Sequence, residues 1–80
     1  MTTWCVYVLR CVDDSLYVGI STNVQKRLEQ HNAGKGAAYT RSHRSVVLVW
    51  TEVVESESAA RKREAQIKTW KRVDKLKLIQ

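Results

Sequence analysis

Five polar side chains stand beside apolar positions in this sequence. Two are phenols, and the others are a guanidinium, an imidazole and a carboxylate: Tyr7, Tyr17, Arg27, His31 and Glu64. Hydrolysis of a phosphodiester needs a base for the attacking water, a cation for the charge of the transition state and a metal ion near the leaving oxygen. These five residue types suit that reaction if the fold gathers them in one place.

Both tyrosines fall within residues 4–20, where two β-prone runs are separated by the polar cluster at 13–15. This pattern predicts a β-hairpin. Side chains alternate along a strand, so a two-residue loop at 13–14 would place the phenols on opposite faces. A three-residue loop at 13–15 would place both on one face, with Leu9 opposite Gly19 and a glycine hollow between the phenols. No Asn-Gly or Asp-Gly favours the shorter loop, so we expect the longer one. The plainer interpretation is that tyrosine is a favoured strand residue and simply packs.

Composition narrows the class of protein. The 80 residues allow one domain over 1–80, and the hydrophobic content of 44% with 28% charged residues is ordinary for a globular protein. No apolar run approaches the roughly 20 residues that span a bilayer, and no export signal follows Met1, so we expect no membrane association. Cys5 and Cys11 lie too far apart along one extended segment to be bridged, and free thiols suit a reducing cytoplasm.

The net charge of +6, from 14 Lys and Arg against 8 Asp and Glu, makes nucleic acid the leading partner class. Residues 34–44 form a basic loop with one aromatic side chain, which is suited to follow a nucleic-acid backbone. Five candidate nucleic-acid contacts lie in this loop, and a sixth is a lysine further along the chain. They are Lys35, Tyr39, Arg41, His43, Arg44 and Lys68. A basic surface kept only for solubility is the competing explanation.

The first helix is expected to carry two of the five candidates. Thr22, with Gln25 three residues on, fits an N-cap, and Gly34 fits the C-terminal end. The inward stripe comprises Val24, Leu28 and His31. Arg27 lies on the shoulder of this stripe, four residues before His31. A guanidinium and an imidazole are awkward for a purely structural face, although a snorkelling Arg27 beside a core-bordering His31 would also explain the pair.

Residues 45–54 form an almost continuous apolar, β-branched run, which predicts a third strand that is central or well covered. The tail, residues 73–80, is expected to close the fold as a short helix or turn. Its Lys75 and Lys77 are expected to face solvent.

A second helix is expected to begin after Ser56 or Ser58 and to continue to about Trp70. At about 100° per residue, its inward stripe comprises Ala60, Glu64, Ile67 and Lys71. Glu64 is therefore expected to point inward. An ordinary surface pair between Glu64 and Lys68 at i, i+4 is the competing explanation.

In this order, the motifs resemble those of the GIY-YIG nuclease family. The first motif is Cys5-Val6-Tyr7 and the second is Tyr17-Val18-Gly19, followed by Arg27, His31 and Glu64. Residues 34–37 and 63–68 are especially similar to the small stand-alone proteins of this family, and the resemblance covers nearly the whole chain. There are departures from the pattern. Cys5 replaces a glycine, and Thr22 stands where other members have a lysine. Some members also have an asparagine late in the chain that belongs to the site, but no asparagine follows Asn32 here.

The resemblance implies an α/β (α+β) fold with a three-stranded antiparallel sheet flanked by helices, in the order β-β-α-β-α-α. It implies cleavage of DNA with one divalent ion, Mg²⁺ or Mn²⁺, for which Glu64 would be the only protein ligand. Arg27 would hold the scissile phosphate, and Tyr17 would position phosphate or water. Tyr7 would activate the attacking water with help from His31. An ordinary phenol has a pKa of ~10, so the base is either Tyr7 as a phenolate favoured by cations or His31 itself.

We therefore expect a structure- or damage-directed endonuclease, because a chain of this size has no separate domain for reading sequence. A protein partner is one possible source of targeting, and the sequence indicates no oligomeric state. A non-catalytic nucleic-acid-binding module with the same fold is the alternative. A structural adaptor that buries its tyrosines is a third interpretation.

Overall fold

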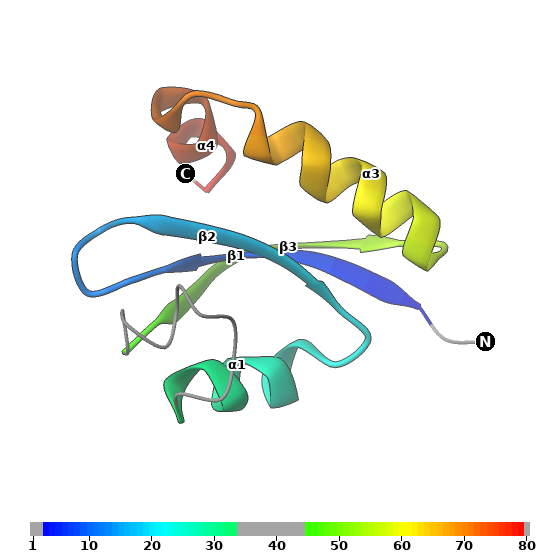
Figure 1. Cartoon of the computed structure of the whole chain (residues 1–80), viewed down its shortest axis with the longest axis horizontal. Helices are drawn as coiled ribbons and strands as arrows, with labels where there is room; N and C mark the ends of the chain where they lie inside the picture. The colour runs from blue at the N-terminus through cyan, green and yellow to red at the C-terminus, as the bar shows by residue number, and fades with distance from the viewer. Residues whose placement is uncertain (1–2, 34–44, 80) are drawn as a thin grey trace.

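A computed structural model of the chain describes residues 3–33 and 45–79 (Figure 1). Within them the elements are β1 (Trp4–Arg10), β2 (Leu16–Ser21), α1 (Val24–Asn32), β3 (Val47–Val54), α3 (Glu57–Lys68) and α4 (Arg72–Leu78). The strands form one antiparallel sheet in the order β2-β1-β3. Helix α1 covers one face of the sheet, and α3 and α4 cover the other (Figure 1). The expected fold and element order are confirmed.

The central strand β1 takes part in two separate apolar clusters. Four consecutive residues in it are at most 1% exposed: Val6, Tyr7, Val8 and Leu9. Val6 and Val8 pack with Ala60 and Ile67 of α3. Tyr7 and Leu9 pack on the opposite face, with Leu28 of α1. Alternation along one strand therefore sends aliphatic side chains toward α3 and a phenol toward α1.

The hairpin between β1 and β2 turns through a three-residue loop, one residue earlier than expected. The Cys11 N–H donates to the Ser15 carbonyl and the Asp14 N–H to the Cys11 carbonyl, each at 2.9 Å, so the loop is residues 12–14. Asp14 has a φ of 67°, the left-handed conformation common at the end of such loops. Ser15 lies outside the loop, directly before β2, because its carbonyl accepts from Cys11; its own N–H donates to the Asp13 carboxylate at 3.1 Å.

The register of the hairpin settles which face each tyrosine occupies. Tyr7 lies opposite Gly19 and Leu9 lies opposite Tyr17, so the expected pairing of Leu9 with Gly19 is wrong by two residues. A shift of two residues leaves every side chain on its original face. The expectation that both phenols share one face is therefore confirmed.

Helix α1 begins one residue later than expected. Asn23 is its N-cap, and the Asn23 side chain accepts from the Lys26 N–H at 3.1 Å, so the expected cap at Thr22 is wrong. The Ser21 hydroxyl accepts from the Asn23 N–H at 3.0 Å and fixes the turn that leads into the cap. The helix ends at Asn32, just before Gly34, which lies outside the described residues. The inward stripe is as predicted, since Val24 and Leu28 are half-buried and His31 is buried.

Strand β3 lies at the edge of the sheet, which corrects the expectation of a central or well-covered strand. Its Val47 and Val53 are 54% and 65% exposed. A β-branched run indicates extended backbone but not a place in the sheet, and the central place belongs to β1. The strand begins at Val47 because Ser45 has a φ of 68° and because the Val46 N–H donates to the Asn32 side chain at 2.8 Å.

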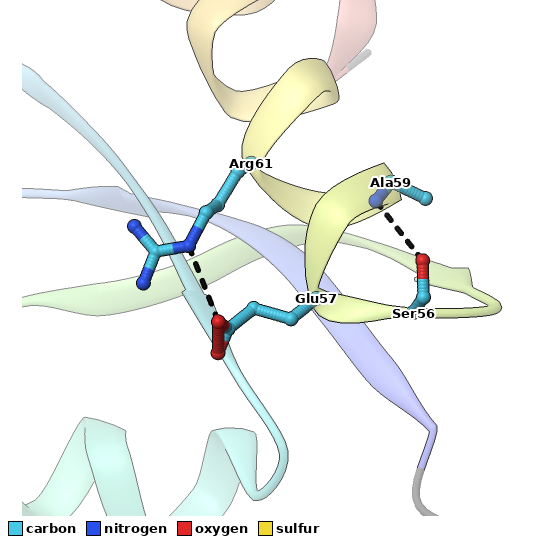
Figure 2. A network of polar contacts seen from close by, with 4 residues as sticks. All are labelled: Ser56, Glu57, Ala59 and Arg61. Atoms are coloured by element: carbon cyan, nitrogen blue, oxygen red, sulfur yellow. Dashed lines mark hydrogen bonds and ion pairs between the residues drawn. The ribbon is translucent and has the colours of Figure 1, made fainter.

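Helix α3 is capped by Ser56, the first of the two serines considered. The Ser56 hydroxyl accepts from the Ala59 N–H at 3.1 Å, as Figure 2 shows. In the first turn, Glu57 pairs with Arg61 at 3.4 Å. The Ser56 hydroxyl gives a partner to a backbone N–H group that has none within the helix. The negative charge of Glu57 is favourable at the positive, N-terminal end of the helix dipole.

The inward stripe of α3 is shorter than expected. Ala60 and Ile67 are fully buried and Glu64 is half-buried, as predicted. Lys71 is exposed because α3 ends at Lys68, about two residues earlier than expected, and Lys71 instead precedes α4 as its N-cap. The predicted stripe therefore holds only over the three residues that lie within the helix.

The closing helix of the tail is present as α4. Lys77 is exposed as expected, whereas Lys75 is half-buried. Trp70, at the turn between α3 and α4, packs against the apolar cluster on this face of the sheet. The tail thus completes the cover over β1 and β2.

Two further expectations concern thiols and membranes. Cys5 and Cys11 are both free, as expected. Among the helices of residues 3–33 and 45–79, none is both long enough and apolar enough to cross a bilayer.

Candidate active site

Tyr7 forms the centre of the site because it projects from the middle of the central strand toward α1. Its partner across the hairpin is Gly19, and a Cβ at Gly19 would lie 2.5 Å from the Tyr7 hydroxyl oxygen and 2.6 Å from Cζ. The same Cβ would lie 3.0 Å from Cε1 of Tyr17. The Tyr7 ring therefore lies across the glycine, and only a residue without a side chain leaves room for it.

Three aromatic rings surround this glycine hollow. The ring centroids of Tyr7 and Tyr17 are 6.4 Å apart, and His31 lies edge-on to both, at 6.1 Å from Tyr7 and 5.2 Å from Tyr17. The Tyr7 hydroxyl is hydrogen-bonded to Nε2 of His31 at 3.0 Å. Tyr7 and His31 are buried, whereas Tyr17 is half-buried and lies toward the rim of the cluster.

Burial controls the protonation of the hydrogen-bonded pair. Burial raises the pKa of Tyr7 to about 12, although the Arg27 side chain beside it acts in the opposite direction. Burial also lowers the pKa of His31 below its ordinary value, and the charge of Arg27 lowers it further. At neutral pH the site therefore holds a protonated phenol against a neutral imidazole.

Arg27 lies on the shoulder of α1, as expected, and is half-buried. One guanidinium nitrogen donates to Oε1 of Gln30 at 3.0 Å, which orients the group beside Tyr7. Sequence reasoning missed Gln30, although its i, i+3 spacing from Arg27 is a usable signal.

Glu64 lies on α3, the helix that covers the face of the sheet opposite to the Tyr7 cluster. Its side chain is 22% exposed and forms an ion pair with Lys68 at 3.3 Å. The surface-pair explanation for Glu64 is thus partly right. The carboxylate is nevertheless close enough to contribute to the raised pKa of Tyr7. The structure therefore gathers four candidates in one cluster, Tyr7, Tyr17, Arg27 and His31, whereas Glu64 lies on the helix across the sheet and acts on Tyr7 only through its charge.

The donor set fits a hard cation held by very few protein ligands. No group of three or more His, Cys, Asp or Glu side chains in the described parts of the chain could enclose a metal ion. Glu64 is half-buried, and its charge contributes to the raised pKa of Tyr7, so it is the carboxylate among the site candidates that a metal ion could use. Mg²⁺ commonly binds through one or two carboxylates and keeps several waters, so one carboxylate is an acceptable donor set for it.

The expected nucleic-acid contacts are mostly untested. Five lie outside the described residues: Lys35, Tyr39, Arg41, His43 and Arg44. Lys68 is exposed on α3, next to Glu64. Sequence reasoning also missed Asn32, whose side chain exchanges two hydrogen bonds with the backbone of Val46 at 2.8 and 3.3 Å. No local pattern predicts such a contact, because its partners are far apart along the chain.

Comparison with known proteins agrees with the resemblance seen in the motifs. A family model described as the GIY-YIG catalytic domain matches residues 3–77. The chain is 53% identical over 75 residues to the UPF0213 protein SH2523 of Staphylococcus haemolyticus, covering 94% of this chain and 92% of that protein. It is 55% identical over 75 residues to a UPF0213 protein of Syntrophus aciditrophicus, covering 92% of this chain and 86% of that one.

Two solution NMR structures have a similar fold. The UPF0213 protein BH0048 from Bacillus halodurans is 38% identical, with a TM-score of 0.62 over 96% of this chain and 82% of that chain. The protein EF2693 from E. faecalis is 40% identical, with a TM-score of 0.63 over 94% of this chain and 80% of that chain.

Proposed function

The chain belongs to the GIY-YIG nuclease family, and from that membership we propose that it is a divalent-metal-dependent endonuclease that hydrolyses DNA phosphodiester bonds. The observation that carries the proposal is the buried hydrogen bond between the Tyr7 hydroxyl and His31 Nε2, with the Arg27 guanidinium beside it. A purely structural core has no need of a phenol, an imidazole and a guanidinium together.

The site divides into a binding half and a proton-transfer half. Arg27 and Tyr17 are half-buried, which supports assigning to them the contacts with a phosphate at the rim of the cluster. Arg27 binds the scissile phosphate and stabilises the negative charge of the transition state. Tyr17 orients the phosphate or the attacking water through its hydroxyl.

Tyr7 and His31 form the proton-transfer half. A phenol with a pKa of about 12 is a poor base on its own, so Tyr7 acts as a relay that passes its proton to His31 as it receives one from water. His31 suits the acceptor role because its pKa is lowered and its ring is neutral at pH 7. The relay needs the proton of His31 on Nδ1, which leaves Nε2 to accept from Tyr7.

Glu64 is the residue that would hold the cation, either Mg²⁺ or Mn²⁺. When bound, such an ion supplies charge stabilisation at the phosphate and at the leaving oxygen. Glu64 can release Lys68 without loss of fold, because an i, i+4 pair of this kind contributes only about 0.2–0.5 kcal/mol.

The net charge of +6 supports DNA as the substrate, and contacts to phosphate carry little sequence information. We therefore assign substrate choice to DNA structure or damage rather than to base sequence. We propose that residues 1–80 form one nuclease domain. A cytoplasmic location fits the free thiols of Cys5 and Cys11.

The experiment is incubation with supercoiled, single-stranded and branched DNA, with Mg²⁺, with Mn²⁺ or with EDTA. Cleavage is expected only with metal, and Glu64→Ala is expected to abolish it. Glu55→Ala removes the same charge from an exposed position and serves as the matched control. Cleavage by Glu64→Ala at the wild-type rate would contradict the proposal.

A non-catalytic nucleic-acid-binding module is the second candidate. The burial of Tyr7 and the pairing of Glu64 with Lys68 favour it, since both restrain reactive groups. This function predicts DNA binding that falls steeply with salt, survives Glu64→Ala and is never accompanied by cleavage.

A further inference from the structure

A second hollow lies on the other side of the sheet, where α3 ends and α4 begins. Its volume is about 470 Å³, and among the described residues it is lined by Trp70, Asp74, Lys77 and Leu78. This volume falls in the range of roughly 300–1,000 Å³ typical of small-molecule sites. None of the residues that line it has a role in the cluster around Tyr7.

Contacts on two sides tie the lining of this hollow to the sheet. Trp70 is half-buried against the apolar cluster, and the Arg63 guanidinium lies 5.3 Å from the centroid of its ring. Arg63 is itself held by Glu52 of β3 at 3.0 Å. On the other flank, Arg72 donates to the Asp14 carbonyl of the hairpin loop at 2.6 Å and ties α4 to the sheet.

The four side chains offer three kinds of contact. Trp70 and Leu78 supply an aromatic and an aliphatic surface, Asp74 an acceptor and Lys77 a cation. Asp74 and Lys77 are exposed, and no ion pair within residues 3–33 and 45–79 engages either of them. The base of a nucleotide stacks on such an aromatic surface and can donate an N–H hydrogen bond to a carboxylate, while the phosphate of the same nucleotide meets a lysine.

The position of the hollow relative to Glu64 matters for the choice of occupant. Glu64 and Trp70 are six residues apart. Four of these steps lie in α3, and the last two lie in the turn where the N–H groups of Thr69 and Trp70 donate to carbonyls three residues back, so at 1.5–2.0 Å per residue the separation is about 10 Å. One strand of B-form DNA covers that distance in about three nucleotides at ~3.4 Å each. A base inside a duplex is stacked and paired, so only an unpaired base can enter.

Resting on the proposed nuclease function, we propose that the hollow lined by Trp70, Asp74, Lys77 and Leu78 receives one unpaired nucleobase of the DNA substrate, about three nucleotides along the strand from the metal ion that Glu64 would hold. The site thereby selects DNA that carries an unpaired nucleotide, such as a fork or a damaged duplex.

The test is cleavage of a forked DNA in which each unpaired nucleotide is replaced in turn by an abasic one. With the wild-type protein and Mg²⁺, one position near the cut is expected to lower kcat/KM about tenfold, as expected for loss of one stacked base. Trp70→Leu keeps the apolar packing but removes the aromatic face. It is expected to cleave the intact fork about tenfold more slowly and to be insensitive to the abasic position.

A second variant avoids the core, in case Trp70→Leu does not fold. Lys77→Ala changes an exposed side chain of α4 and is expected to weaken binding of the fork in EDTA more than Lys62→Ala, which removes the same charge from an exposed position of α3. Equal losses in the two variants, or a wild-type rate indifferent to every abasic position, would overturn the proposal. If no DNA is cleaved at all, the nuclease function fails, and the binding comparison in EDTA still decides on the hollow.

Discussion

Replacing Gly19 by alanine tests the geometry of the site most directly. The added Cβ would lie 2.5 Å from the Tyr7 hydroxyl oxygen and 2.6 Å from Cζ, about 1 Å closer than an ordinary carbon contact of roughly 3.5 Å. Tyr7 is 1% exposed and hydrogen-bonded to His31, so its ring can yield only by giving up that bond. The substitution therefore perturbs packing and chemistry at the same point.

The size of the effect follows from two opposing terms. Overpacking a buried site costs about 1–3 kcal/mol. Alanine recovers about 0.4–1 kcal/mol by restricting the unfolded chain, since Gly19 has an ordinary strand conformation. A net loss of about 1–2 kcal/mol lowers Tm by roughly 5–15 °C for a chain of this size. A ring displaced by about 1 Å is expected to reduce kcat about 100-fold.

The assay is a double-mutant cycle with Tyr7→Leu, monitored by thermal denaturation. Leucine removes the two Tyr7 atoms nearest to the new Cβ and leaves only the contact with Cε1 of Tyr17 at 3.0 Å, so Gly19→Ala should cost much less in that background. DNA cleavage by the single variant provides the second measurement. Equal costs in the two backgrounds would refute the reasoning, because the clash would then not involve Tyr7.

Four further predictions follow from the same geometry. Tyr7→Phe is expected to fold with a normal near-UV circular dichroism spectrum and to cleave about 10²–10⁴-fold more slowly. Full activity would show that the Tyr7 hydroxyl takes no part in the proton transfer. Arg27→Ala is expected to lose about 10²–10³-fold in kcat with little change in Tm, and an unfolded variant would instead support a packing role. Lys68→Ala is expected to lower the Mg²⁺ concentration for half-maximal cleavage about twofold, because Glu64 then no longer pairs with a competing cation. An unchanged concentration would show that Glu64 does not bind the metal ion. The pH dependence follows from His31, whose pKa is lowered in the fold. Its contribution to stability is therefore complete above the ordinary value of ~6.5 and is lost as pH falls through the lowered value, and cleavage should fall in the same range. A cleavage rate that is flat from neutral to acid pH would exclude His31 as the acceptor.

The face shared by the two phenols was predictable from the sequence because it depends only on whether the loop has an odd or even number of residues. The register itself was not predictable. It is set by contacts of Asp13 and Asp14 inside the turn, which move the loop to residues 12–14. Composition alone does not rank those contacts against the alternative loop at 13–15.

Other features of the fold were not predictable because they depend on partners distant in sequence. The apolar run in β3 indicated a strand, but its edge position follows from the pairing of β1 with both neighbours. The start of β3 depends on Asn32, which binds Val46 across a long connection. The position of Glu64 was likewise not predictable, because periodicity shows that a residue faces inward but not which side of the sheet its helix covers.

The two sides of the sheet are coupled through β1, and this explains how a small fold can hold buried polar groups. Val6 and Val8 secure the strand against α3 while Tyr7, between them, points toward α1. The strand is therefore fixed by aliphatic packing on one face, and its other face can carry a phenol that is hydrogen-bonded rather than merely packed. Fixing the strand in this way limits the freedom of Tyr7 before any substrate arrives, which lowers the entropic cost of orienting it in the transition state. The same coupling means that changes in the α3 cluster should alter activity through the position of Tyr7, even though no residue of that cluster contacts the phosphate in the proposed mechanism.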